Sequence, residues 1–121
     1  MIARTWLGIT ARDKAENYLA YLNETGVKSC LETRGNLGVY VLRRLAKDRA
    51  EFLFISLWES LDAIRRFAGP EIDRAVYYPE DREFLQEMAP QVEHYEVLVS
   101  PAPPGTSRRQ GSPLGWVKGL F

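Results

Sequence analysis

The sequence predicts an α+β fold in which helices cover one face of a four-stranded antiparallel sheet. Three observations support this prediction. The residue patterns follow the order strand, helix, strand, strand, helices, strand. The chain has 121 residues, which suits a single domain with one core. The third predicted strand is apolar on both faces, so each of its two sides needs a covering layer.

The first two predicted elements are a strand and a helix. Residues 2–9 alternate loosely and carry β-branched and aromatic side chains, which is typical of a strand. Thr10 followed by Asp13 resembles a capping box with the shorter acid, and it would open a helix. Gly26 is a natural end for that helix. The inward positions of the helix follow the expected spacing at Ala15, Tyr18, Leu19 and Leu22.

Two apolar segments in the middle of the chain predict a β-hairpin. Residues 36–44 and 51–59 are both rich in β-branched and aromatic side chains. A polar segment, residues 46–50, separates them and has the length of a hairpin turn.

Short helices and a last strand are predicted for the following residues. Ser60 can cap a helix that ends at Gly69. Pro70 and the acids after it would begin a second helix. Residues 92–99 predict the fourth strand. Before it, residues 79–89 predict a last helical piece whose inward side chains are Phe84, Leu85 and Met88.

This order of elements is that of the split βαβ, or ferredoxin-like, fold. The third strand presents two apolar sets on opposite faces, which are Leu53, Ile55 and Leu57, and Phe52, Phe54 and Trp58. The helices can cover only one set, and each large apolar side chain gains about 1.5–3 kcal/mol on burial. We therefore expect a homodimer that pairs sheet to sheet as a dimeric α/β barrel, with the second set in its interface. The alternative is that the C-terminal tail covers this face.

We expect residues 1–99 to form the folded domain and residues 100–121 to form a tail. The tail begins as a Pro/Gly/Ser-rich linker without periodicity. It ends with apolar side chains, which is unusual for a solvated end. Two interpretations stay open: the tail docks on its own domain or on the partner subunit, or it is a loose extension.

The composition excludes several classes of function. Sixteen basic residues balance sixteen acidic ones, so no overall field favours nucleic acid or a membrane surface. Cys30 is the only cysteine and His94 the only histidine, which excludes an intrachain disulfide and a histidine-pair zinc site. We therefore expect no protein-bound metal. The N-terminal apolar run is too short for a signal peptide and no segment reaches membrane-spanning length, so we expect a cytoplasmic protein.

Several stretches resemble the antibiotic biosynthesis monooxygenase (ABM) superfamily of dimeric α/β barrels. The similarity covers roughly residues 1–99, and its most telling part is the strand–Trp–Glu–Ser–helix phrase. The stretches are IARTW (2–6), GNLGVYVLRR (35–44), FISLWESLDAIRRFAG (54–69), AVYYPED (75–81) and HYEVL (94–98).

The resemblance implies two kinds of chemistry. Some members of the superfamily oxidise aromatic polyketides or quinols with molecular oxygen and without metal or flavin, and others bind and open haem. The haem-degrading members use an asparagine on the first strand, a tryptophan on the helix after the Trp-x-Ser turn, and a histidine on the next helix as iron ligand. In this sequence those positions fall near Leu7, Phe67 and Tyr77, and all three depart from the pattern. Haem degradation is therefore disfavoured, and we expect no cofactor.

The resemblance favours a cofactor-independent monooxygenase that acts on a small aromatic, phenolic or polyketide-like compound. Under this hypothesis His94 is the catalytic base, because imidazole has a pKa of about 6.5 and suits proton abstraction at neutral pH. Tyr77 is a catalytic hydroxyl donor. Arg4 could supply charge, depending on the strand face it occupies. The substrate would lie in a cleft between helices and sheet, lined by Leu7, Leu22, Phe67 and Tyr78.

A function of another class stays open, namely a non-catalytic dimeric barrel that binds a small hydrophobic ligand. Polar groups in the cleft distinguish the two hypotheses. If His94 and the hydroxyls of Tyr77 and Tyr78 point away from the cleft, catalysis loses these candidates and binding is favoured.

Overall fold

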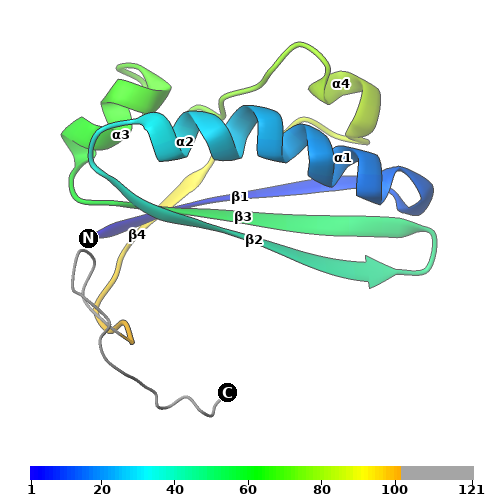
Figure 1. Ribbon diagram of the computed structural model, residues 1–121, viewed down its shortest axis with the longest axis horizontal. Coiled ribbons are helices and arrows are strands. Elements are labelled where there is room, and N and C mark those ends of the chain that lie inside the picture. Colours follow the sequence, from blue (N-terminus) through cyan, green and yellow to red (C-terminus); the bar gives the residue numbers. More distant parts are fainter. Residues whose placement is uncertain (102–121) are drawn as a thin grey trace.

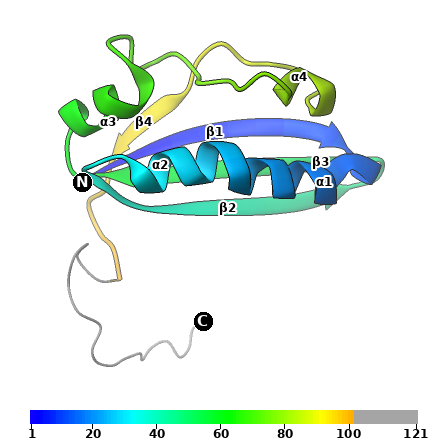
Figure 2. The same ribbon diagram turned by 45° about the horizontal axis from the view of Figure 1, so that its top comes forward.

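The computed structural model describes residues 1–101 and has the predicted ferredoxin-like architecture (Figure 1). A four-stranded sheet has the order β2-β3-β1-β4, and all neighbouring strands are antiparallel. The helices lie together on one face of this sheet (Figure 2). The predicted fold class is therefore confirmed. The predicted tail, residues 100–121, lies almost wholly outside the described residues.

The first strand is longer than its pattern indicated. Strand β1 (Ile2–Ala11) runs through Thr10, so the predicted capping box at Thr10 is wrong. The Thr10 hydroxyl donates to the carbonyl oxygen of Ala11 at 2.9 Å and caps no helix. A 3₁₀ turn (Arg12–Lys14) follows, and helix α1 (Ala15–Leu22) begins after it.

The first helical layer does not end at Gly26, which corrects a second prediction. A π-helical turn (Asn23–Val27) joins α1 to helix α2 (Lys28–Glu32) without a break. Gly26 is buried, and a Cβ atom there would lie 3.3 Å from the ring of Phe54. Glycine at this position therefore serves close approach of the helix to the sheet, and it is not a stop signal.

The central hairpin is confirmed, with strand β2 (Asn36–Ala46) paired to strand β3 (Arg49–Trp58). Helix α3 (Leu61–Ala68) begins after Ser60, as predicted, and Gly69 follows its end with a positive φ of 85°. Gly69 suits this position because a side chain would be strained there.

The segment between α3 and the last strand is less helical than predicted. Residues 70–80 form turns, so the helix expected from Pro70 is wrong. Helix α4 (Asp81–Phe84) is one turn long, and Met88 is 39% exposed, so neither the predicted length nor the inward position of Met88 holds. Strand β4 (Glu93–Glu96) is shorter than the predicted 92–99.

The two faces of β3 are assigned opposite to our expectation. Phe52, Phe54 and Trp58 are buried beneath the helices. The aromatic set faces the helices because it makes ring contacts with them. Tyr18 of α1 packs edge-on against Phe52 at a centroid distance of 5.2 Å, and Phe67 of α3 stacks on Trp58 at 5.6 Å. The interface we predicted for these three residues is therefore wrong, since the core of the subunit already covers them.

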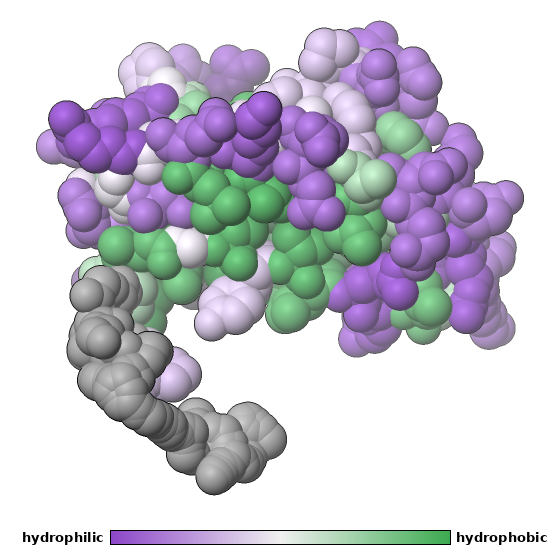
Figure 3. Space-filling view, viewed as in Figure 1, coloured by the Kyte–Doolittle hydropathy of each residue, from purple (hydrophilic) through white to green (hydrophobic). Residues whose placement is uncertain are grey.

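The opposite side of the sheet, the open face, carries its own apolar set. The strand registers place these side chains next to one another. Several are largely exposed, with Leu7 at 52%, Tyr40 at 56% and Tyr95 at 53%. Figure 3 shows apolar side chains gathered along the sheet beneath the polar outer surface of the helices. We define the open face as Ala3, Thr5, Leu7, Ile9, Tyr40, Leu42, Leu53, Ile55, Leu57 and Tyr95.

The N-cap of α3 gives a first testable prediction. The Ser60 Oγ accepts a hydrogen bond from the backbone N–H of Ala63 at 3.1 Å. We expect Ser60→Ala to lower the free energy of unfolding by about 1 kcal/mol, because that N–H loses its acceptor. Ser60→Asp keeps a capping oxygen and should keep the stability. Urea unfolding of the three proteins measures this, and equal losses in both variants would contradict the capping role.

Candidate functional site

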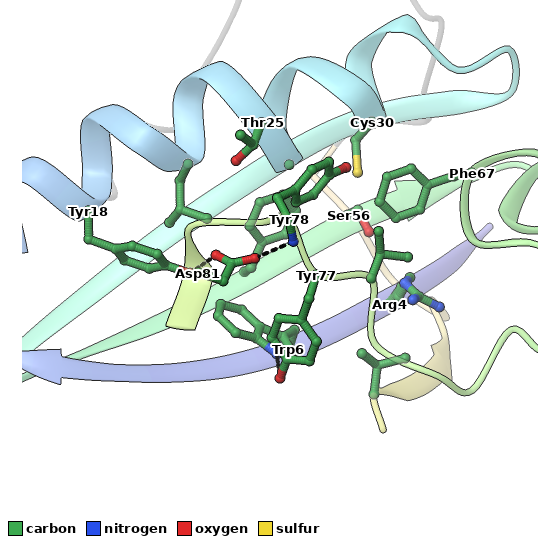
Figure 4. Close-up of a pocket in the computed structure, with 15 residues that line it drawn as sticks. Arg4, Trp6, Tyr18, Thr25, Cys30, Ser56, Phe67, Tyr77, Tyr78 and Asp81 are labelled. Atoms are coloured by element: carbon green, nitrogen blue, oxygen red, sulfur yellow. Dashed lines mark hydrogen bonds between the residues drawn. The ribbon is translucent and has the colours of Figure 1, made fainter. Parts of the chain in front are cut away.

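A pocket lies between the helical layer and the covered face of the sheet (Figure 4). Its empty volume is about 510 Å³, a figure that includes the open space at its mouth. Strands β1 and β3 form its floor, α1, α2 and the turn between them form one wall, and residues 76–81 form another. It is lined by Arg4, Trp6, Tyr18, Leu22, Thr25, Gly26, Cys30, Phe54, Ser56, Phe67, Val76, Tyr77, Tyr78, Asp81 and Val92.

Aromatic rings form much of the wall. Trp6 and Tyr77 meet edge to face at a centroid distance of 6.0 Å. The Trp6 indole N–H donates to the Tyr77 hydroxyl at 3.1 Å, and that hydroxyl donates to the carbonyl of Ala89 at 2.5 Å. These two bonds hold both rings in place, so the wall is formed before any ligand arrives. Preformed flat walls suit a planar aromatic ligand.

Asp81 brings a buried carboxyl group to this wall. Asp81 is only 4% exposed. Oδ2 accepts the backbone N–H of Tyr78 at 2.6 Å, and Oδ1 accepts the Tyr18 hydroxyl at 3.4 Å (Figure 4). Burial raises the pKa of the Asp81 carboxyl, while its hydrogen bonds from Tyr78 and Tyr18 oppose that rise. A carboxyl with a raised pKa in a pocket is a candidate acid or base.

Arg4 brings a buried positive charge to the same pocket. The residue is 4% exposed, and its guanidinium lies 5.7 Å from the centre of the Phe67 ring. One terminal nitrogen, Nη1, donates to the carbonyl of Ile72, and the other, Nη2, donates to the carbonyl of Arg74 at 2.8 Å. Burial lowers the pKa of Arg4, although arginine keeps its proton in proteins.

His94 stands behind Arg4 and does not line the pocket. The register pairs His94 of β4 with Arg4 of β1, and His94 Nε2 lies 3.2 Å from Arg4 Nη1. His94 Nδ1 lies 3.3 Å from a carboxylate oxygen of Asp73. Burial, followed by the charge of Arg4, lowers the pKa of His94, so the ring is neutral at neutral pH. Its predicted position in the cleft is therefore wrong, because Arg4 occupies the space between.

The far end of the pocket holds a thiol. Cys30 is buried, and burial raises its pKa to about 12. Ser56 hydrogen bonds with this thiol and accepts the indole N–H of Trp58 at 2.8 Å. Cys30 is thus a neutral packing group at neutral pH and not a thiolate nucleophile.

The structure brings together four of the six site residues that we predicted. Leu22, Phe67, Tyr77 and Tyr78 line the pocket. Leu7 lies instead on the open face and is 52% exposed, which corrects its prediction as a cleft wall. The reason is strand alternation, since Arg4 and Trp6 of the same strand point toward the helices and odd-numbered positions point away.

Both predicted tyrosine hydroxyls are already engaged by the protein. The hydroxyl of Tyr77 is held by Trp6 and Ala89, and the hydroxyl of Tyr78 hydrogen bonds with Ser29. Sequence reasoning missed Asp81, which it placed in a helix as an ordinary acid. A signal existed in the acid three residues after Tyr78, since such an acid can turn back to bond a preceding backbone N–H.

Residues 1–101 offer neither a cluster of metal ligands nor a membrane-spanning helix. This part of the chain contains no group of three or more histidine, cysteine, aspartate or glutamate residues placed to hold a metal ion. None of its helices has the length and apolar character needed to cross a membrane.

Comparison with known proteins gives matches at the level of structure. No family model matches the sequence, and no curated protein matches it. A structure of the haem degrader MhuD from Mycobacterium tuberculosis with two haems in its active site matches with a TM-score of 0.52 and 19% identity. The match covers 84% of this chain and 100% of that one. A mutant MhuD with two manganese protoporphyrin IX molecules per active site gives a TM-score of 0.53 and 16% identity over 85% of this chain and 100% of that one.

A protein of unknown function from Nitrosomonas europaea matches with a TM-score of 0.48 and 15% identity, over 86% of this chain and 95% of that one. At these identities the matches bear on the fold alone. The two MhuD structures and the strand order agree, and the chain has the ferredoxin-like α+β fold.

Proposed function

We propose that the protein binds a small aromatic or phenolic compound in the pocket between helices and sheet and oxidises it with molecular oxygen, without a bound cofactor. The observation that carries this proposal is the buried Asp81 carboxyl on a wall of aromatic rings. The rings suit a planar substrate, and the carboxylate can take a proton from it. The resemblance of the sequence to the ABM superfamily supports the same chemistry.

In this proposal the protein's part is to bind the substrate and move one proton. Asp81 Oδ1, which has only a long bond from Tyr18 at 3.4 Å, takes a proton from an activated C–H or phenolic O–H. The substrate carbanion then reduces oxygen. A CH₂ group and O₂ become a carbonyl group and water, so one oxygen atom enters the product and the other leaves with both hydrogens. Tyr77, which we predicted as a hydroxyl donor, would align the substrate through its ring, because its hydroxyl already donates to the carbonyl of Ala89.

We also propose that two copies pair through the open face. Apolar side chains from all four strands meet there, and three of them are more than half exposed in the single subunit. A contiguous exposed apolar patch on a protein surface marks an interaction site. A twofold sheet-to-sheet contact would bury each of these side chains twice and give the dimeric α/β barrel implied by the resemblance.

Oxygen-consumption screening tests the proposed reaction. We expect quinols or anthrone-like phenols to stimulate oxygen uptake by the wild-type protein, with one carbonyl product per oxygen molecule. Tyr77→Phe tests the predicted catalytic residue that lines the pocket, and an equal rate in this variant and the wild type would remove its role. His94→Ala should keep the wild-type rate, because His94 does not line the pocket. Binding of the same compounds without oxygen uptake would favour the non-catalytic alternative.

Haem is the ligand of the MhuD neighbours and forms a second candidate. The pocket residues fit it poorly, because the groups able to ligate iron are engaged or protonated. The Tyr77 and Tyr78 hydroxyls bond to the protein, and the Cys30 thiol has a pKa of about 12. We expect haem titration to give no ligated Soret band. A saturable Soret shift at one haem per subunit would favour haem handling over phenol oxidation.

A further inference from the structure

The charge of Arg4 forms no ion pair with any residue that the structure describes. The residue is 4% exposed and lines the pocket, yet its hydrogen-bond partners are two backbone carbonyls and the ring of His94. In residues 1–101, no carboxylate forms an ion pair with Arg4. A buried charge is stable only with compensation from hydrogen bonds and an opposite charge. The first of these is present, and no ion pair supplies the second.

The neighbours of Arg4 provide little of that opposite charge, because Asp73 attracts Arg4 only from a distance. Asp73 reaches only as far as His94 Nδ1, at 3.3 Å, and His94 stands between it and Arg4. The Asp73 side chain is 74% exposed, so water screens it. Cys30 is close enough to influence Arg4, but with a pKa of about 12 it carries no charge at neutral pH. Figure 4 shows Asp81 farther along the wall, beyond Tyr77.

The guanidinium of Arg4 also has N–H groups that make no hydrogen bond within residues 1–101. Arginine has five N–H donors in a planar fork. Nη1 donates to the carbonyl of Ile72 and contacts Nε2 of His94, and Nη2 donates one hydrogen bond to the carbonyl of Arg74. Among the described residues, the Nε–H and one Nη2–H therefore have no acceptor. Neighbouring N–H groups of a guanidinium match the two oxygens of a carboxylate.

We propose that the ligand of this pocket is an aromatic carboxylate whose anionic group pairs with Arg4. This inference rests on the proposed function and narrows its substrate to an aromatic acid. The carboxylate lies against the guanidinium, beside the ring of Phe67, which itself contacts Arg4 at 5.7 Å. The aromatic part extends along Trp6 and Tyr77 toward Asp81, so the two charged groups of the pocket meet different parts of one ligand (Figure 4).

Naphthoate and its uncharged isostere naphthamide test this proposal with the full chain. The two compounds share ring and shape and differ in charge. We expect the wild-type protein to bind naphthoate at least about tenfold more tightly than naphthamide, as measured by calorimetry. Arg4→Gln should bring the ratio of the two affinities to about one. Arg65→Gln, an exposed arginine on α3, is the matched control and should keep the wild-type ratio.

The outcomes separate this proposal from the proposed function. Tight binding of naphthamide with no preference for naphthoate would overturn the anion subsite and leave the aromatic pocket standing. Absence of binding for both compounds would overturn the aromatic pocket and the subsite together. The wild-type ratio decides without any variant, so a poorly folded Arg4→Gln protein does not block the test. Arg4→Lys then offers a second variant, which keeps the charge and should keep part of the preference.

Discussion

Exchange of Asp81 for asparagine is expected to lower kcat for aromatic oxidation by about 10²–10⁴-fold. The amide has the size of the carboxyl group, and its single oxygen can still accept the Tyr78 N–H, which reaches Asp81 at 2.6 Å. Its NH₂ group then takes the place of the oxygen that lies 3.4 Å from the Tyr18 hydroxyl, and it can donate to that hydroxyl. It cannot take a proton from the substrate. The measurement is oxygen uptake with a saturating phenolic substrate found in the screen.

The stability of the same variant is a second readout. Burial raises the pKa of Asp81 in the folded state above the ordinary value of 3.8, so the folded protein holds that proton more tightly than the unfolded chain. The contribution of Asp81 to stability is therefore present at low pH and is lost as the pH rises through the folded-state pKa. At neutral pH, Asp81→Asn should leave the free energy of unfolding unchanged or raise it. Lost activity caused by misfolding would instead appear with lost stability.

The pH profile of kcat/KM should show the same group. The base is active when ionised, so the rate should rise with pH through an apparent pKa above 3.8. That acid limb should vanish in Asp81→Asn. Asp62→Asn, an exposed carboxyl on α3, is the matched control and should keep both the rate and the limb. An unchanged kcat in Asp81→Asn would remove the carboxylate from the mechanism.

Replacement of Leu7 by aspartate should dissociate the proposed dimer. Leu7 lies on the central strand β1 opposite Leu53, in the middle of the open face, and is 52% exposed in the single subunit. Twofold pairing would bury the new carboxylate twice, and the desolvation of each charge costs several kcal/mol. We therefore expect the dissociation constant of the dimer to rise by at least about a thousandfold. Sedimentation equilibrium at micromolar concentration measures this.

A matched variant controls for the general effect of a new charge. Leu31 on α2 is 57% exposed and lies away from the open face, so Leu31→Asp should leave the dimer intact. Circular dichroism should show folded subunits in both variants, because each side chain is already largely exposed. Dissociation by Leu31→Asp with an intact Leu7→Asp dimer would place the interface on the helices.

The element order of the strands and the fold class could be predicted from the sequence, because the strands are rich in β-branched and aromatic residues and the first helix has the spacing of an amphipathic helix. Which face of β3 the helices cover could not be predicted. Phe52, Phe54 and Trp58 alternate with an equally apolar set, so period alone gives no sign of which side meets the helices. Contact of Phe52 with Tyr18 and of Trp58 with Phe67 decides it, and those contacts join residues far apart in the chain.

The position of a site residue could be predicted where it depends on one helix or loop. It could not be predicted where it depends on how two strands pair. Phe67 and Tyr77 line the pocket as the resemblance implied. Leu7 was predicted to face the cleft, but it lies on the open face. The sequence does not indicate which side of β1 meets the helices. His94 lies on the covered face, but its pairing with Arg4 puts the guanidinium in front of it. That register depends on the long connection before β4, which carries little periodicity.

Amide NMR during titration with naphthoate decides whether the pocket between helices and sheet binds a small aromatic compound. We expect saturable shifts of the Trp6 indole N–H and of the backbone amides of Gly26 and Tyr78, which lie at the pocket. Amides of the open face, such as those of Leu7 and Tyr40, should stay in place. Shifts confined to the open face, or no shift at saturating naphthoate, would show that the pocket does not bind this class of compound.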